Sequence, residues 1–378
     1  MESPVIVSFA ETATPIWDVP FPAITICPET KTRKDIFNFG DAFEELNKTE
    51  TIKNKTSRNF FNCLSDICKT IDYDPVSTEK FPKSINASDF IKTLESTEPI
   101  FHKMFDFCMW LNNVSECKST FQKVLTDEGL CYTFNYLSFS DIFAVKEQLI
   151  SSTKTDFSID KSDWNLDEFS KNGGLKKVPL RTVNSGWKFG FTVSLSSYER
   201  DYDYWCGMNF EGFRVSMNLP GEVPQLTQRF IKVPVGMEVE IAVEPIIIYT
   251  SDGLRDRDYT SDIRQCYFQD ERYLRYFKVY TQSNCELECL TNYTLHKCGC
   301  VKFYMPRNSS TPVCGLGMYN CYKSAEHELI FKEINSSIIA NCKCLLACTM
   351  IDYNSNIHHI KNNFDIFKFR PGLFIENE

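Results

Sequence analysis

Long hydrophobic runs are missing from this 378-residue sequence. Apolar stretches such as Ile246–Tyr249 are only a few residues long, whereas a transmembrane helix needs roughly 20 consecutive apolar residues. The first residues, Met1-Glu2-Ser3-Pro4, lack the basic segment of a secretory signal, and Glu11 interrupts any apolar core. The sequence therefore predicts neither a membrane-spanning helix nor a signal peptide within its own length.

Positive charge and histidine are also scarce. The 41 Lys and Arg are outnumbered by 50 Asp and Glu, for a formal net charge of −9 at pH 7. Without a basic stripe to neutralise phosphates, a nucleic-acid partner is not expected. Only 5 histidines are present, His358 and His359 lack a third ligand type nearby, and G-x-S-x-G, H-E-x-x-H, P-loop and G-x-G-x-x-G motifs are absent. We therefore predict no enzymatic activity, no catalytic residue, no metal site and no cofactor.

Cysteine, by contrast, is abundant, with 17 residues in all. Seven N-x-[ST] sequons accompany the cysteines, at Asn47, Asn54, Asn86, Asn113, Asn292, Asn308 and Asn335. Dense cysteine and scattered sequons together favour a disulfide-bonded, glycosylated protein in an oxidising compartment. The odd total leaves at least one thiol unpaired or paired between chains.

Zinc binding is the alternative use of the closely spaced pairs Cys298/Cys300 and Cys342/Cys344. Structural zinc sites usually separate two ligands by roughly two to four residues, and here only one residue intervenes. No histidine falls at a companion position. Disulfide bonds are therefore the stronger interpretation.

The apolar patterns predict an α+β fold. Strands with one buried face are expected where apolar residues alternate, at residues 23–27, 187–195, 213–219 and 239–243. Helices are expected at Asp89–Leu94, at Phe101–Leu111, from a capping box at Ser283 and Glu286 to Gly299, and from Ser324 onward.

The spacing of four cysteines suggests two parallel disulfide rungs. Cys285 and Cys289 lie one turn apart on one face of a predicted helix. Their rise of roughly 6 Å matches the roughly 6–7 Å between residues 342 and 344 of an extended segment. The spacing does not by itself determine the connectivity.

Several motifs together resemble one family. The run Phe21-Pro22-Ala23-Ile24-Thr25-Ile26-Cys27-Pro28 is similar to the first ectodomain strand of the degenerin/epithelial sodium channel family, and Cys131-Tyr132-Thr133-Phe134-Asn135 is similar to its C-Y-T-F-N segment. Three further motifs are similar to the thumb of this family: Cys285-x3-Cys289, Cys298-Gly299-Cys300 with Met305-Pro306, and Cys342-x-Cys344-Leu345-x-x-Cys348. The run at 20–30 resembles the insect pickpocket-type members in particular.

The resemblance implies a hand-shaped channel ectodomain with an antiparallel β palm, a peripheral helical finger and knuckle lobe, and a disulfide-laddered two-helix thumb. The implied parts are a first palm strand at 1–30, a finger-like lobe at 31–130, a β-rich palm at 131–265, a Cys-rich thumb at 266–350, and a return to the palm at 351–378. The family's two membrane helices and its selectivity filter are expected outside this sequence, so the chain alone is not expected to conduct.

A disulfide pairing for fourteen cysteines is also implied by the resemblance. The implied bonds are Cys27–Cys131, Cys108–Cys117, Cys266–Cys348, Cys285–Cys344, Cys289–Cys342, Cys298–Cys321 and Cys300–Cys314. Three further cysteines are extra to this pattern. We expect a local Cys63–Cys68 bond, which leaves Cys206 as the unpaired thiol.

For function, the resemblance implies the extracellular gating or ligand-sensing domain of an amiloride-sensitive sodium channel subunit. Such a subunit would lie in the plasma membrane as part of a homo- or hetero-trimer that conducts sodium ions. A secreted or receptor-like disulfide-rich glycoprotein without channel activity is the alternative, and flanking gene sequence that encodes no apolar helix would favour it. Candidate acid- or ligand-sensing carboxylates are Glu199, Asp201, Asp203, Asp252, Asp256 and Asp258. Solvated loops, in which arginines alternate with these acids, are the favoured interpretation of both clusters.

Overall fold

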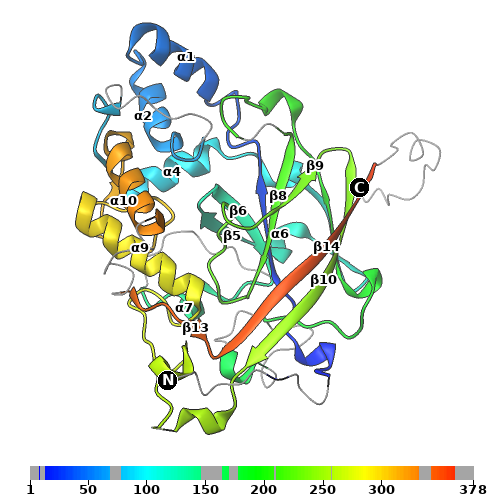
Figure 1. The fold of residues 1–378 in the computed structure, drawn as a ribbon. Coiled ribbons are helices and arrows are strands. Elements are labelled where there is room, and N and C mark those ends of the chain that lie inside the picture. Colours follow the sequence, from blue (N-terminus) through cyan, green and yellow to red (C-terminus); the bar gives the residue numbers. More distant parts are fainter. Residues whose placement is uncertain are drawn as a thin grey trace, which may run out of the picture.

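A five-stranded antiparallel sheet, hereafter the central sheet, lies in the middle of the molecule (Figure 1). The computed structural model describes residue 8 and residues 13–68, 78–145, 164–169, 178–207, 210–256, 258–331 and 342–361. In sheet order the strands are β5 (Phe121–Thr126), β6 (Gly129–Phe134), β1 (Ala23–Pro28), β8 (Gly212–Asn218) and β9 (Ile231–Pro234). The strand predicted at 23–27 is thus the middle strand, and its Ala23, Thr25 and Cys27 are fully buried.

A smaller sheet packs against the central sheet through aromatic side chains. It contains β4 (Asn113–Ser115), β3 (Phe105–Trp110) and β7 (Phe191–Leu195). The rings of Phe134 and Phe191 stack with centroids 4.1 Å apart, and those of Phe105 and Phe121 lie 4.8 Å apart. Burial of these large rings supplies much of the core between the two sheets.

The prediction of a helix at Phe101–Leu111 was wrong over most of this range. Only α5 (Phe101–Met104) is helical, and the chain then continues as β3. Strand β3 pairs with both β4 and β7, and the Cys108–Cys117 bond closes the hairpin region. Pairing on both sides therefore outweighs the local helical pattern, because tertiary context overrides a weak propensity.

Three helices form a peripheral layer with its own core (Figure 1). These are α1 (Phe39–Thr49), α2 (Lys55–Leu64) and α4 (Ala87–Thr97), each with an asparagine side chain as its N-cap. Phe39 stacks on Phe61 at 4.8 Å, and Phe90 stacks on Phe303 at 5.2 Å. The second contact joins this layer to the Cys-rich region, as does the pairing of β2 (Ser84–Ile85) with β12 (Val313–Cys314).

The Cys-rich region holds two helices, hereafter the helix pair: α9 (Gln282–Cys298) and α10 (Tyr319–Phe331). Helix α9 ends at Gly299 as predicted, with a left-handed φ of 71°. The predicted N-cap, Ser283, is wrong, because the N-cap is Thr281, whose hydroxyl accepts a hydrogen bond from the Asn284 amide at 3.1 Å. Helix α10 likewise begins at Tyr319 and not at Ser324.

A long two-stranded ribbon crosses the molecule (Figure 1). Its strands are β10 (Met237–Tyr249) and β14 (Thr349–Lys361), paired in register from Met237↔Lys361 to Tyr249↔Thr349. At its Tyr249 end, the short strands β11 (Cys266–Tyr267) and β13 (Leu346–Ala347) pair in parallel, and Cys266 is bonded to Cys348. Tyr353 in β14 donates a hydrogen bond to the Pro20 carbonyl at 2.9 Å, which ties the ribbon to the entrance of β1.

The remaining elements are single turns that connect these parts. They are η1 (Ile16–Asp18), α6 (Cys117–Thr120), α7 (Phe139–Ile142), η2 (Leu166–Glu168), η3 (Trp187–Phe189), η4 (Glu199–Asp201), η5 (Asp252–Arg255), α8 (Ser261–Arg264) and η6 (Leu316–Met318). The predicted mixture of helices and antiparallel sheets is confirmed. No helix in the described part of the chain combines the length and the apolar character needed to cross a membrane.

Candidate functional site

Eight disulfide bonds cross-link the described residues. They are Cys27–Cys131, Cys68–Cys206, Cys108–Cys117, Cys266–Cys348, Cys285–Cys344, Cys289–Cys342, Cys298–Cys321 and Cys300–Cys314. Seven of these are the pairs that the family resemblance implies. Two of them, at Cys285 and Cys289, join one face of α9 to the segment that leads into β13.

The expected Cys63–Cys68 bond is corrected by the structure, in which Cys68 pairs with Cys206 and Cys63 is a buried free thiol. Helix α2 ends at Leu64, and the amide of Cys68 donates to the Leu64 carbonyl at 2.8 Å, so the turn between them keeps a helix-like hydrogen bond. Residues five apart on a helix point about 140° apart, which turns the two sulfur atoms away from each other. Burial raises the pKa of the Cys63 thiol to about 11, and this keeps it protonated and unreactive.

The helix pair is further held together by charged and polar contacts. The Lys297 ammonium contacts Glu328 at 2.7 Å, and the Tyr293 hydroxyl donates to the same carboxylate at 2.7 Å. Lys302, buried after α9, lies 3.6 Å from Asp66 and 3.5 Å from Glu326. Burial disfavours the charged form of Lys302, but these acids outweigh it and raise its pKa, so the residue remains a cation between α2 and α10.

The base of α9 meets the loop after β8 at a joint formed by residues 219–225 and 279–284. Asn284 is fully buried there, and its Oδ1 accepts a hydrogen bond from the Val223 amide at 3.1 Å. Its Nδ2 donates to the carbonyls of Gly221 and Val279, both at 3.1 Å. One side chain therefore connects α9 to the loop after β8 with two hydrogen bonds, and a third fixes it to the segment that precedes α9.

The role of Asn284 was not predicted from the sequence. Asparagine is unfavourable inside a helix, because its side chain competes for nearby backbone groups. An asparagine in the first turn of a predicted helix was therefore a usable sign that its side chain is engaged elsewhere. The partner loop, which lies about sixty residues away along the chain, gave no such sign.

A half-buried carboxyl group also belongs to the joint. Thr281 donates to Glu222 Oε1 at 3.4 Å, and Asn218 Nδ2 donates to the Glu222 carbonyl at 2.8 Å. Burial raises the pKa of the Glu222 carboxyl, and hydrogen bonds from Ser283, the Leu219 backbone and Thr281 oppose this effect only in part. Glu222 is thus the joint residue whose charge is most sensitive to acid.

We expect Glu222→Gln to flatten the pH dependence of the free energy of unfolding. Because the folded-state pKa lies above the unfolded value of about 4.3, the stability that this carboxyl contributes is complete below about pH 4 and is lost as the pH rises through the folded pKa. The amide of the variant stays neutral at every pH. The free energy of unfolding of the variant should therefore increase relative to that of wild type as the pH rises towards 7. Urea unfolding from pH 4 to 8 measures this, with Glu199→Gln as the matched loss of one exposed carboxylate. Parallel profiles for wild type and Glu222→Gln would contradict the assignment.

The predicted sensing carboxylates are not gathered into one site. Asp203 is buried against α1, where it accepts hydrogen bonds from the amides of Gly40 at 2.9 Å and Trp205 at 3.0 Å. Asp201 is also buried, whereas Glu199 is exposed. The second cluster lies at the other end of the molecule (Figure 1), where Asp256 and Asp258 are exposed. The side chain of Asp252 lies outside the described residues, and a sensing role for any of the six stays a prediction.

Most of the predicted glycosylation sites are accessible. Asn47, Asn54, Asn86, Asn113 and Asn292 are exposed, and Asn308 is half-buried. The seventh site, Asn335, lies outside the described residues. Asn54 and Asn86 also cap α2 and α4 through their side-chain oxygens, and glycan attachment at any of these positions stays a prediction.

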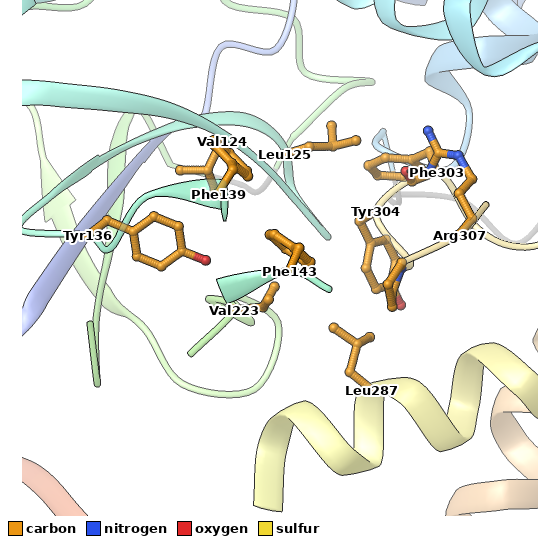
Figure 2. A pocket seen from close by; sticks show the side chains of 11 residues that line it. Val124, Leu125, Tyr136, Phe139, Phe143, Val223, Leu287, Phe303, Tyr304 and Arg307 are labelled. Carbon is orange, nitrogen blue, oxygen red and sulfur yellow. Dashed lines mark hydrogen bonds between the residues drawn. The ribbon is translucent and has the colours of Figure 1, made fainter. Parts of the chain in front are cut away.

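An apolar hollow of about 480 Å³, open to solvent, lies beside the joint (Figure 2). Its walls come from β5, from the segment that follows β6 up to Phe143, from the loop after β8 at Val223, from α9, and from the loop after α9. Three polar side chains line it, with Tyr136 on one side and Tyr304 and Arg307 on the other. Within the ranges described above, no group of three or more His, Cys, Asp and Glu side chains is placed to hold a metal ion.

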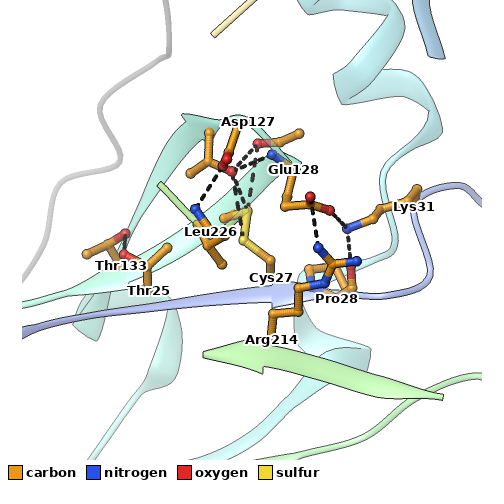
Figure 3. The surroundings of a disulfide bond; sticks show 12 residues. Thr25, Cys27, Pro28, Lys31, Asp127, Glu128, Thr133, Arg214 and Leu226 are labelled. Atoms are coloured by element: carbon orange, nitrogen blue, oxygen red, sulfur yellow. Dashed lines mark hydrogen bonds and ion pairs between the residues drawn. A yellow bond between two sulfur atoms is a disulfide. The ribbon is translucent and has the colours of Figure 1, made fainter. Parts of the chain in front are cut away.

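A network of buried charges surrounds the end of β1 at Pro28 (Figure 3). Arg214 in β8 contacts both Glu29 and Glu128, the latter at 2.8 Å. Lys31 contacts Glu128 at 3.1 Å and donates to the Pro28 carbonyl at 3.0 Å. The network joins the end of β1 and the β5–β6 turn to β8, next to the Cys27–Cys131 bond.

These features define a disulfide-stabilised α+β domain in which a cross-linked helix pair is joined to an antiparallel sheet. The chain belongs to the amiloride-sensitive sodium channel family, whose model matches residues 1–375. The proposed resemblance to the degenerin/epithelial sodium channel group is thereby confirmed. The family is one of ion channels and not of enzymes.

Several curated relatives match nearly the whole chain. Pickpocket protein 28 of Drosophila melanogaster is 28% identical over 367 residues, covering 94% of this chain and 55% of that protein. Sodium channel protein Nach of the same species is 21% identical over 381 residues, covering 95% and 64% respectively. Acid-sensing ion channel 1C of Danio rerio is 23% identical over 376 residues, covering 95% and 58%. The chain thus spans roughly half to two-thirds of the length of these relatives.

Proposed function

We propose that this chain forms the extracellular gating domain of an amiloride-sensitive sodium channel subunit in the plasma membrane. The observation that carries the proposal is the family match over nearly the whole chain. Eight disulfides and several exposed sequons suit the oxidising, extracellular side of that membrane. The pore that conducts sodium would be supplied by segments that precede and follow residues matched here.

In this proposal the parts of the fold take the family's roles. The central sheet and the ribbon form the palm, the peripheral layer at 31–130 forms the finger-like lobe, and residues 266–350 form the thumb. We further propose a homo- or hetero-trimer, with subunit contacts on the ribbon, where the apolar side chains of Ile246, Ile248 and Tyr249 are exposed.

The proposed mechanism is a rigid-body movement of the helix pair about the joint. The rungs at Cys285 and Cys289 prevent α9 from sliding along the segment 342–344, so a force on the helix pair reaches its base undiminished. Asn284 then carries the movement to the loop after β8, and Cys348 carries it to the ribbon. The stimulus itself, whether protons or another ligand, would act on the helix pair or the peripheral layer.

A chimera tests this function. Residues 1–378 replace the matching region of Drosophila Pickpocket protein 28, and the product is recorded in oocytes. We expect a sodium current that amiloride reduces, together with a trimer on chemical cross-linking at the cell surface. A chimera that reaches the surface by biotinylation and stays monomeric and silent would refute the proposal.

The same chimera tests the rungs. The pair Cys285→Ser with Cys344→Ser is expected to lower the stimulated fraction of the current while surface expression persists. The matched control is Cys300→Ser with Cys314→Ser, which removes a bond of the same region that does not link α9 to the segment before β13. Equal losses in both variants would indicate general damage and not a broken lever.

A further inference from the structure

Positively charged side chains line a second hollow, hereafter the cationic hollow. It lies between the end of β1, the segment from α4 to α5, and the turn after β7, and its polar lining includes Thr30, Arg33, Lys103, Ser197 and Arg200. Its space for the centres of water-sized groups is about 40 Å³, and a single water needs about 10–15 Å³ of such space. The cationic hollow therefore has room for a compact group of a few heavy atoms and not for a longer organic ligand.

Two of the three cations in this lining have no ion pair with the described residues. Arg200 is paired, because its Nε lies 3.7 Å from Oδ1 of the buried Asp201. In the described part of the chain, neither Arg33 nor Lys103 has a carboxylate within ion-pair distance. Asp35, the other acid of the lining, is exposed. The three cations and two carboxylates leave the lining with a net charge of +1.

Several hydrogen-bond donors of the lining also lack acceptors. The Arg33 Nη2 donates to the Ser96 carbonyl at 2.9 Å, but the Nε of the same guanidinium is buried without a partner. Thr30 is 7% exposed and Ser197 is half-buried, and neither hydroxyl forms a hydrogen bond within the described residues. Buried donors without acceptors cost free energy, so the lining favours an occupant that accepts hydrogen bonds.

The cations are held in place by different parts of the fold. Lys103 Nζ and Arg200 Cζ lie 4.9 Å and 5.7 Å from the centre of the same ring, that of Tyr198. Arg33 is fixed to the end of α4, because its amide donates to the Thr97 carbonyl at 2.9 Å. Like charges that are gathered at one hollow repel each other, and an anion between them relieves this repulsion.

We propose that the cationic hollow binds one tetrahedral oxyanion, a sulfate or phosphate group, with Arg33 and Lys103 as its charged partners. Guanidinium and ammonium groups are the usual partners of such anions, and hydroxyls such as that of Thr30 can donate to the remaining oxygens. The oxygens of the anion are water-sized and lie closer together than water molecules do, so they suit the available space. Binding belongs to the folded chain and does not depend on channel activity.

Equilibrium dialysis of the folded chain against radiolabelled sulfate or phosphate at low ionic strength tests the site. We expect one saturable site, and Arg33→Gln and Lys103→Gln should each weaken binding at least about tenfold. The matched control is Lys188→Gln, because Lys188 is exposed, lies 5.5 Å from the Trp187 ring and is not part of the cationic hollow. This variant should bind the anion as wild type does.

Asp35→Asn tests the site with the opposite sign. Removal of this exposed carboxylate from the lining should tighten binding about twofold to fivefold, which damage to the fold would not do. Competition by N-acetylglucosamine 6-sulfate, but not by N-acetylglucosamine, would support the sulfate ester of a glycan as the occupant. Competition by the inorganic anions alone would support the free ion.

Three results would overturn the proposal. They are the absence of saturable binding in the millimolar range, unchanged affinity in a folded Lys103→Gln, and unchanged or weaker binding in Asp35→Asn. A silent chimera whose ectodomain binds the anion normally would contradict only the channel function.

Discussion

Arg214→Met is expected to lower the free energy of unfolding by about 3–5 kcal/mol, because it takes the shared cation away from two buried carboxylates. Glu29 is fully buried, the Glu128 side chain is 2% exposed, and both contact Arg214 (Figure 3). Lys31 would remain as the cation that contacts Glu128. Methionine matches much of the volume of the arginine stem, so the loss reports on charge more than on packing.

Urea unfolding of wild type and variant at pH 7 measures this loss. Arg229→Met is the matched control, because Arg229 forms an exposed pair with Asp352 at 2.7 Å, and such pairs contribute about 0–1 kcal/mol. Raising the salt concentration should change the stability of wild type little, since buried pairs are weakly screened. Equal losses in the two variants would show that the network around Arg214 behaves as a surface ion pair.

Removal of the Cys68–Cys206 bond is expected to cost about 2–5 kcal/mol, because the bond closes a loop between residues that are 138 apart in sequence. The variant Cys68→Ser with Cys206→Ser measures this cost without leaving a lone thiol. Cys63→Ala, the matched control, removes a buried sulfur that forms no bond, and should cost only about 1 kcal/mol. Thermal unfolding of the oxidised proteins compares the stability of the two variants, and the double serine variant is expected to unfold at the lower temperature.

Peptide mapping without reduction provides the direct check on this bond. A cross-linked peptide that contains Cys68 and Cys206 is expected, and Cys63 should react with an alkylating reagent only after unfolding. Recovery of a Cys63–Cys68 peptide, with Cys206 labelled in the folded protein, would reverse the assignment. The reduced stability would then be expected in Cys63→Ala and not in Cys206→Ser.

Repeating patterns in the chain predicted much of the architecture. Alternation identified β1, β8 and β10, and the glycine after α9 marked its end, because these signals depend on local geometry. The Cys-rich spacing also suggested two rungs on α9, and the pairs Cys285–Cys344 and Cys289–Cys342 are present. Their assignment required the family resemblance, since spacing admits more than one connectivity.

The parts that were missed depend on contacts between distant segments. Cys68 meets Cys206 only after the peripheral layer has packed on the loop at 203–207, through contacts such as Trp205 against Phe43 at 5.1 Å. Arg307 and Tyr136 likewise lie on opposite sides of a hollow whose walls come from five parts of the chain. No single stretch of sequence carries a signal for either arrangement, because neither has a local period.

The ribbon of β10 and β14 has a mechanical consequence. Its thirteen paired positions, at a rise of roughly 3.3 Å each, give an arm about 43 Å long. One end is fastened at Cys348, which is bonded to Cys266 and lies next to the parallel strands β11 and β13. A tilt of about 5° at that fastened end would swing the tip at Met237 and Lys361 by roughly 4 Å over an arm of this length. A small tilt at the disulfide-bonded end would therefore displace the far tip by nearly the spacing of about 4.8 Å between neighbouring strands.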